Sequence, residues 1–188
     1  IWTIDELKNR ILITLFFLIV YRLAAQVVLP GVDYNIISEA QIAGGGGLLG
    51  LLNAFTGGAF ANASVVALGI MPYISASIVV QLMGVALPYL QKLQKEGESG
   101  RKKITQITRW LTIAICVVQA PAYLYGLGAL GVPDAAFVLG KGPFFIIPSV
   151  IILVTGCIFA MWLGEKITDR GIGNGISLLI TVGIIASL

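Results

Sequence analysis

The stretch that most resembles a chemical site is the glycine-rich sequence Gly171–Gly175, whose composition suggests a phosphate-binding loop. Such a loop follows a buried strand and opens a helix, so that backbone N–H groups can cradle the anion. Here no strand precedes the glycines. A charged segment, Glu165–Arg170, stands before them and an apolar run follows. The nucleotide-binding interpretation is therefore disfavoured, and the glycines are interpreted as the opening of a membrane helix.

Few other residues could do chemistry. The sequence has no histidine, and Cys116 and Cys157 each lie inside an apolar run, which is typical of packing residues. It contains no metal-ligand pattern, no acid–base pair and no nucleophile triad. Arg22 is the one ionisable residue well inside an apolar run, and backbone carbonyls or a snorkelling side chain would satisfy it. The sequence predicts a protein that is not an enzyme and that needs no cofactor.

The elements that carry these residues are apolar and long. Hydrophobic residues make up 57% of the chain and charged residues 11%, with a mean hydropathy of +0.96. A helix that crosses a bilayer needs about 20 mostly apolar residues. The sequence therefore predicts an all-α integral membrane protein. Its five expected spans cover residues 11–29, 67–90, 110–130, 143–164 and 172–188.

The cations predict how these spans are oriented. Ten of the twelve Lys and Arg residues fall in alternate segments: the N-terminus, Gln91–Arg109 and Glu165–Arg170. The opposite loops contain only Lys141. Cytoplasmic loops are enriched in Lys and Arg. We therefore expect a cytoplasmic N-terminus and two cytoplasmic polar loops.

The second span begins with an unusual segment, Gly69–Ile78. Pro72 removes a backbone donor, so the helix is expected to begin or kink there. Polar residues follow it, and Ile70, Ile74 and Ile78 share one face at a spacing of four. Broken helices at membrane depth line cavities or are buried in protein. Two interpretations stay open, a pathway lining and a helix interface built from small residues.

A four-glycine run, Gly44–Gly47, precedes a short apolar stretch, Leu48–Phe55. This stretch is too short to span a bilayer. We expect a short helix that dips into the membrane or packs within the protein, on a flexible hinge.

Three motifs together identify a family. Leu68–Ile78, Lys95–Lys103 and Trp162–Ser177 resemble, in order, the SecY family of protein-conducting channel subunits in the bacterial translocon. The resemblance extends over essentially the whole chain and covers the first half of a SecY protein. It implies one half of a ten-helix channel built from an inverted repeat, with a re-entrant plug helix at about residues 48–60.

The resemblance also implies four functional groups of residues. An isoleucine pore ring would contain Ile70, Ile74, Ile176 and Ile180. The plug would contain Leu48, Leu49, Leu51, Leu52, Asn53, Phe55 and Phe60. One side of a lateral gate would contain Ser75, Ile78, Val79 and Leu82. A cytoplasmic contact loop would contain Lys95, Arg101, Lys102 and Lys103.

The function implied is passive conduction of secretory proteins across, and insertion of membrane proteins into, the inner membrane. The implied partners are SecE, SecG, the SecA ATPase or a ribosome, signal sequences, nascent polypeptides, lipid and the other half of the channel. No direct nucleic-acid contact is expected. The alternatives are half of an inverted-repeat solute transporter and a non-conducting binding scaffold. The scarcity of intramembrane ionisable residues disfavours the transporter.

Overall fold

The structure, a computed structural model, describes residues 3–37, 39, 51, 58–59, 63–68, 70–129, 134, 137–138, 140 and 142–187. In this part of the chain the only extended pairings are two isolated bridges, Val28 with Ser64 and Val32 with Phe137. The predicted all-helical class is thereby confirmed for the described residues. The helices follow in the order α1 (Asp5–Gln26), α4 (Met71–Ala86), α5 (Pro88–Lys95), α6 (Glu98–Ala129), α7 (Pro143–Arg170) and α8 (Gly175–Ser187).

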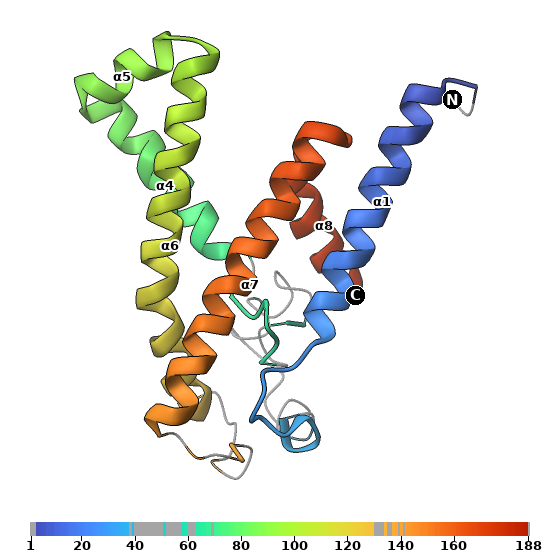
Figure 1. The fold of residues 1–188 in the computed structure, drawn as a ribbon, viewed down its shortest axis with the longest axis vertical. Helices are drawn as coiled ribbons and strands as arrows, with labels where there is room; N and C mark the ends of the chain where they lie inside the picture. The colour runs from blue at the N-terminus through green and yellow to red at the C-terminus, as the bar shows by residue number, and fades with distance from the viewer. Residues whose placement is uncertain are drawn as a thin grey trace.

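Helix α7 is the centre of the arrangement. It packs against α6 on one side and against α1 and α8 on the other (Figure 1). Helix α4 packs along α6, at the outer edge of the group. Figure 1 also shows the start of α1, the α5–α6 turn and the α7–α8 turn at the same end of the molecule.

Within the described residues, two helices are long and apolar enough to cross a membrane: Glu98–Leu127 and Pro143–Arg170. A third span results if α4 and α5 count as one broken span, and Gly175–Ala186 is a shorter apolar helix. The expectation of five spans therefore stays a prediction. The boundaries differ from the expected ones mainly at polar ends, where helices continue beyond the apolar run.

The break between α4 and α5 bends the chain by 102°. Pro88 stands at the start of α5, and Leu87 before it is extended, with φ −101° and ψ 120°. A proline obstructs the helical conformation of the residue before it and cannot donate to the preceding turn. The sequence predicts that a helix begins or kinks at Pro72. Helix α4 begins at Met71, so Pro72 lies in its first turn, where a proline is tolerated.

The prediction of a polar loop over Gln91–Arg109 was wrong. This segment is helical except for a turn at Glu96–Gly97, where Gly97 adopts a φ of +78°. Helix α5 buries Leu90 and Leu93, so its charged residues cover one face of an amphipathic helix. Helix α6 approaches α5 so closely at Gly100 that a Cβ there would meet the carbonyl oxygen of Leu93.

The second predicted polar loop, Glu165–Arg170, was also wrong, because these residues form the last turns of α7. Hydropathy alone placed the helix end at the first charge. The helix ends instead at Gly171, whose N–H donates to the carbonyl of Ile167 at 2.8 Å. A glycine just past the last helical residue is a common stop.

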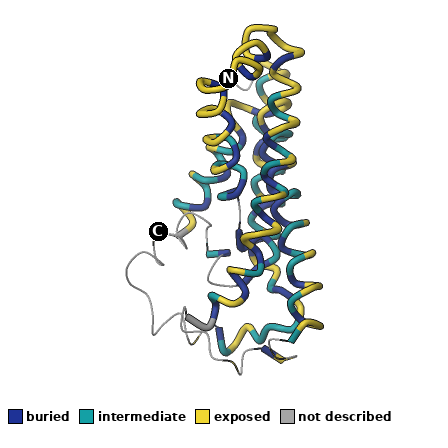
Figure 2. The backbone as a smooth tube through the Cα atoms, turned by 90° about the vertical axis from the view of Figure 1, so that its left-hand side faces the viewer, coloured by how far each residue is buried: buried dark blue, intermediate teal, exposed yellow. Residues whose placement is uncertain are grey.

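Burial is unequal along the bundle (Figure 2). Helix α7 buries residues on several faces, among them Leu153, Gly156, Ala160 and Gly164. Small residues allow backbones to approach closely in membrane bundles. At Gly156 an added Cβ would meet the carbonyl of Val65, so this contact has no room for a side chain.

Candidate functional site

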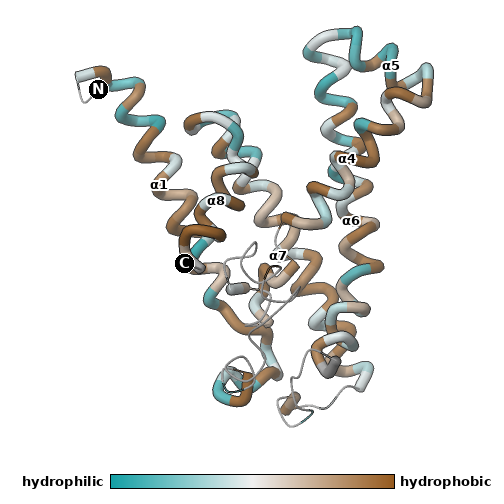
Figure 3. The backbone as a smooth tube through the Cα atoms, turned by 180° about the vertical axis from the view of Figure 1, so that it is seen from behind, coloured by the Kyte–Doolittle hydropathy of each residue, from teal (hydrophilic) through white to brown (hydrophobic). Residues whose placement is uncertain are grey.

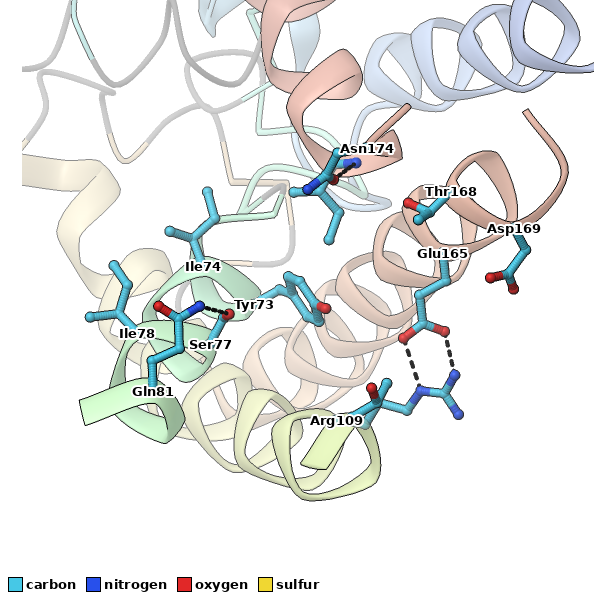
Figure 4. Close-up of a pocket in the computed structure, with 12 residues that line it drawn as sticks. Tyr73, Ile74, Ser77, Ile78, Gln81, Arg109, Glu165, Thr168, Asp169 and Asn174 are labelled. Atoms are coloured by element: carbon cyan, nitrogen blue, oxygen red, sulfur yellow. Dashed lines mark hydrogen bonds and ion pairs between the residues drawn. The ribbon is translucent and has the colours of Figure 1, made fainter. Parts of the chain in front are cut away.

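A polar pocket of about 480 Å³ lies between α4, α6, α7 and α8 (Figure 4). Four helices contribute to its wall. The lining residues are Tyr73, Ile74, Ser77, Ile78, Gln81, Thr105, Arg109, Glu165, Thr168, Asp169, Asn174 and Ile176. Hydroxyls, amides and charges are mixed here with isoleucines. Such a surface can be wetted, and it becomes apolar where Ile74 and Ile176 stand.

An ion pair forms one wall of the pocket. The guanidinium of Arg109 donates from Nε to Glu165 Oε1 at 2.9 Å and from Nη2 to Oε2 at 2.5 Å. This two-point geometry is the strong form of the Arg–carboxylate interaction. The Arg109 side chain is 41% exposed and that of Glu165 is 18% exposed, so solvent weakens the pair only in part. The pair joins the start of α6 to the end of α7.

Tyr73 and Gln81 bring α4 to the same pocket. Figure 4 shows the Tyr73 ring extending from α4 towards Glu165. One turn along, Gln81 Nε2 donates to Ser77 Oγ at 3.4 Å. These polar groups lie on the pocket side of a helix whose other exposed residues are largely apolar.

The structure brings the predicted ring residues close to one another. Ile70 is buried in a cluster with Tyr21, Leu163 and Leu179, and Ile176 and Ile180 pack against that cluster. Ile74 and Ile176 both line the pocket. The N–H of Ile74 donates to the carbonyl of Ile70 at 3.0 Å, which places the pair at the first turn of α4. We call Ile70, Ile74, Ile176 and Ile180 the isoleucine cluster, of which Ile74 and Ile176 line the polar pocket. That it forms a pore ring stays a prediction.

The predicted gate residues share an outward face of α4. Ser75, Ile78, Val79 and Leu82 are all exposed, Leu82 by 67%. Ile78 also lines the pocket, so the face and the pocket share an edge. In the described part of the chain, this gate face is left uncovered. Its role in a gate stays a prediction.

Of the other two predicted groups, the structure describes the contact residues and little of the plug. The contact residues Lys95, Arg101, Lys102 and Lys103 are exposed on the hairpin of α5 and α6 rather than in a loop. For the plug, Leu48, Leu49, Leu52, Asn53, Phe55 and Phe60 lie outside the described residues. Leu51 is described and exposed. The plug assignment therefore stays an expectation.

Sequence reasoning missed the ion pair. Arg109 and Glu165 were each assigned to a predicted polar loop, and Glu165 also belongs to one of the family motifs. A signal existed, because opposite charges stand at the start of one span and the end of the next, where an antiparallel helix pair brings the two ends together. It also missed Thr14, whose hydroxyl contacts the backbone of Ile172, 158 residues further along the chain.

The fold and the pocket define a class: a helical membrane protein with a polar pocket that Ile74 and Ile176 also line, beside an exposed helix face. The SecY family model matches residues 64–188. The protein translocase subunit SecY of Haemophilus influenzae is 46% identical over 183 residues, and that of Escherichia coli K12 is 44% identical over 185. The Pseudomonas aeruginosa subunit is 46% identical over 185 residues. The chain belongs to the SecY family.

The matches cover 97–98% of this chain but only 41–42% of these three relatives, so the chain spans about two fifths of their length. Two solved structures share the fold. One is described as the structure of a protein conducting channel, the other as Sec61 in the canine ribosome–channel complex from the endoplasmic reticulum. Each has a TM-score of 0.58 at 20% identity, covering 94% of this chain and 36% of the solved chain.

Proposed function

We propose that this chain supplies the N-terminal half of a protein-conducting channel, which moves secretory proteins across the membrane and releases membrane proteins into lipid. The observation that carries the proposal is the polar pocket whose wall includes Ile74 and Ile176. The relatives at 44–46% identity are named protein translocase subunits. They do not favour the alternative of a solute transporter.

The isoleucine cluster would act as the neck of this channel. Branched aliphatic side chains make a narrow constriction that water wets poorly, so ions stay out at rest. An extended polypeptide can push such side chains aside without meeting a strong binding site. Apolar contacts of this kind depend little on sequence, as a channel for many substrates requires. The polar pocket would form one side of the wetted approach.

The gate face of α4 would be the route into lipid. Its exposed Ile78, Val79 and Leu82 suit an apolar segment such as a signal sequence or a nascent membrane helix. The adjoining pocket suits polar chain. A polypeptide could therefore divide between the two according to its own hydropathy. The plug, Leu48–Phe60, would close the other side of the neck at rest.

We further propose that the N-terminus is cytoplasmic and that the chain resides in the inner membrane. Figure 3 shows hydrophilic residues near the N-terminus and along the α5–α6 hairpin, at one end of the molecule. The cation bias assigns that end to the cytoplasm. Single cysteines at Ser99 and at Tyr34 should label from opposite sides of oriented vesicles. Labelling of both from the same side would contradict this orientation.

The proposed partners follow from the same arrangement. The exposed cations Lys95, Arg101, Lys102 and Lys103 would contact a SecA ATPase or a ribosome at the cytoplasmic end. SecE, SecG and the C-terminal half of the channel would cover surfaces that this chain leaves open. One solved relative is described in a ribosome–channel complex, which supports the ribosome as a partner.

The neck is tested by ion leak. In the complete channel, Ile74→Asn with Ile176→Asn should raise resting ion conductance, because amide groups stabilise water in the constriction. Ile151→Asn, a matched change at an exposed position on α7, serves as the control and should leave conductance unchanged. Equal conductance in the double variant and the control would contradict the assignment of the neck.

A further inference from the structure

The turn between α7 and α8 is built for close contact. Gly173 has a φ of +66°, a conformation that side chains disfavour. A Cβ on Gly175 would meet the carbonyl oxygen of Gly164 on α7, and one on Gly171 would meet Thr14 Oγ1. The glycines that resembled a phosphate loop therefore allow α8 to fold back tightly on α7 and α1. Asn174 then caps α8, with Oδ1 accepting from the N–H of Ile176 at 3.1 Å.

Two hydroxyls hold this turn from different helices. On α7, Thr168 Oγ1 donates to the carbonyl of Gly164 and accepts from the N–H of Gly175, both at 2.9 Å. On α1, the buried Thr14 Oγ1 donates to the carbonyl of Arg10 at 2.8 Å and accepts from the N–H of Ile172 at 3.1 Å. The second hydroxyl is the one that ties the turn to α1.

The turn leads directly into the isoleucine cluster. Ile172 stands four residues before Ile176. Asn174, between them, accepts from the N–H of Ile176 and so links the glycine turn to the first turn of α8. Ile176 lies directly over Gly164, where an added Cβ would come within 2.7 Å of its Cγ1. Because α8 begins at the anchored turn, a displacement of Ile172 moves Ile176 relative to α4. Ile180 follows on the same helical face.

We propose that Thr14 is a positioning residue for the channel neck: its hydroxyl fixes the α7–α8 turn and so sets Ile176 and Ile180 against Ile70 and Ile74. This role rests on the proposed function, since it matters only if the isoleucine cluster is the neck. Thr14 contacts no translocating chain itself. It acts by supplying an acceptor to one backbone N–H that the turn leaves without an intrahelical partner.

The matched control is Thr155, on α7. Its hydroxyl donates to the carbonyl of Ile151 at 2.7 Å, the same backbone pattern as Thr14 with Arg10, and its side chain is exposed. In both threonines, substitution by valine removes the hydroxyl and keeps the shape. Only Thr14→Val also removes an acceptor from a distant backbone N–H. Thr14→Ser keeps the acceptor and serves as the rescue variant.

The experiment uses the full-length channel in lipid and compares Thr14→Val, Thr14→Ser, Thr155→Val and Ile176→Asn. Amide hydrogen exchange at Ile172 should accelerate roughly five- to tenfold in Thr14→Val, because the N–H loses its acceptor, and stay unchanged in Thr155→Val. Resting ion conductance should rise in Thr14→Val and in Ile176→Asn. Thr14→Ser should restore both slow exchange and a tight channel.

Equal exchange at Ile172 in Thr14→Val and Thr155→Val would overturn the positioning role. So would a Thr14→Val channel that stays tight while Ile176→Asn leaks, and in that case the neck itself would stand. A tight Ile176→Asn channel would instead overturn the neck, and the positioning role with it.

Discussion

Helices α4 and α7 are both apolar, yet they are buried in different ways. In α4 the buried residues are Pro72, Ala76, Val80 and Gly84, which follow one another at a spacing of four. They make one narrow stripe, which packs against α6. In α7 the buried residues lie on several faces, since α1, α6 and α8 all contact it. Helix α4 therefore lies at the edge of the bundle, and α7 lies at its centre.

The difference suggests a division of labour in the proposed channel. A helix packed on several sides is held in place by its close contacts, and so are the neck residues of α8 that lean on it. A helix packed through one stripe leaves its other faces free for a changing partner. We therefore expect changes in α7 to act on stability, and changes on the gate face of α4 to act on substrate handling.

The largest effect on stability is expected at Gly156 of α7, where the packing leaves no space for a side chain. Gly156→Ala places a methyl group against the backbone of Val65, and overpacking of this kind costs about 1–3 kcal/mol. The thermal midpoint of unfolding of the purified full-length channel in detergent should fall. Gly126→Ala is the control, because the structure has nothing within 4 Å of that position in α6. A fall of the same size in both variants would contradict the close contact at α7.

A moderate effect is expected at the ion pair between α6 and α7. Removing Arg109 leaves a carboxylate that is 18% exposed without its partner, which should cost about 1 kcal/mol after allowance for solvent screening. A double-mutant cycle with Arg109→Ala and Glu165→Ala should therefore show a coupling free energy. Strictly additive effects of the two substitutions would show that the pair contributes nothing.

The smallest effect on stability is expected on the gate face. Leu82→Gln should change the free energy of unfolding by about 0.5 kcal/mol or less, since this side chain is 67% exposed. It should nevertheless reduce insertion of weakly hydrophobic signal sequences, measured in reconstituted vesicles. Val118→Gln, at an exposed position on α6, should leave insertion unchanged. If the two variants insert such sequences equally well, the gate face of α4 has no particular role in substrate handling.

The sequence predicted the fold class and the family, because long apolar runs and long motifs are local signals. It misplaced the polar ends of helices. Glu165 stops an apolar run but not a helix, since its charge is matched by Arg109 from another helix. In the same way, the buried Leu90 and Leu93 extend helical structure through a charged segment.

The candidate site could be predicted only in part. The resemblance to the family implies the four isoleucines, and in the structure Ile176 and Ile180 pack against the cluster that contains Ile70, while Ile74 and Ile176 line one pocket. That they form a ring stays a prediction. The contacts of Thr14 and Arg109 depend instead on how two helices are placed side by side. No pattern within one helix encodes that placement, because many packing arrangements are compatible with the same apolar face.

In the proposed channel, Ile74 and Ile176 face a translocating chain. A photo-crosslinking residue at each position in the full-length channel, with a secretory protein stalled during translocation, tests this most directly. We expect strong crosslinks to the stalled polypeptide from both positions and none from the same residue at Ile151, which is exposed on α7. Crosslinks from Ile151 alone, or equally weak crosslinks from all three positions, would contradict it.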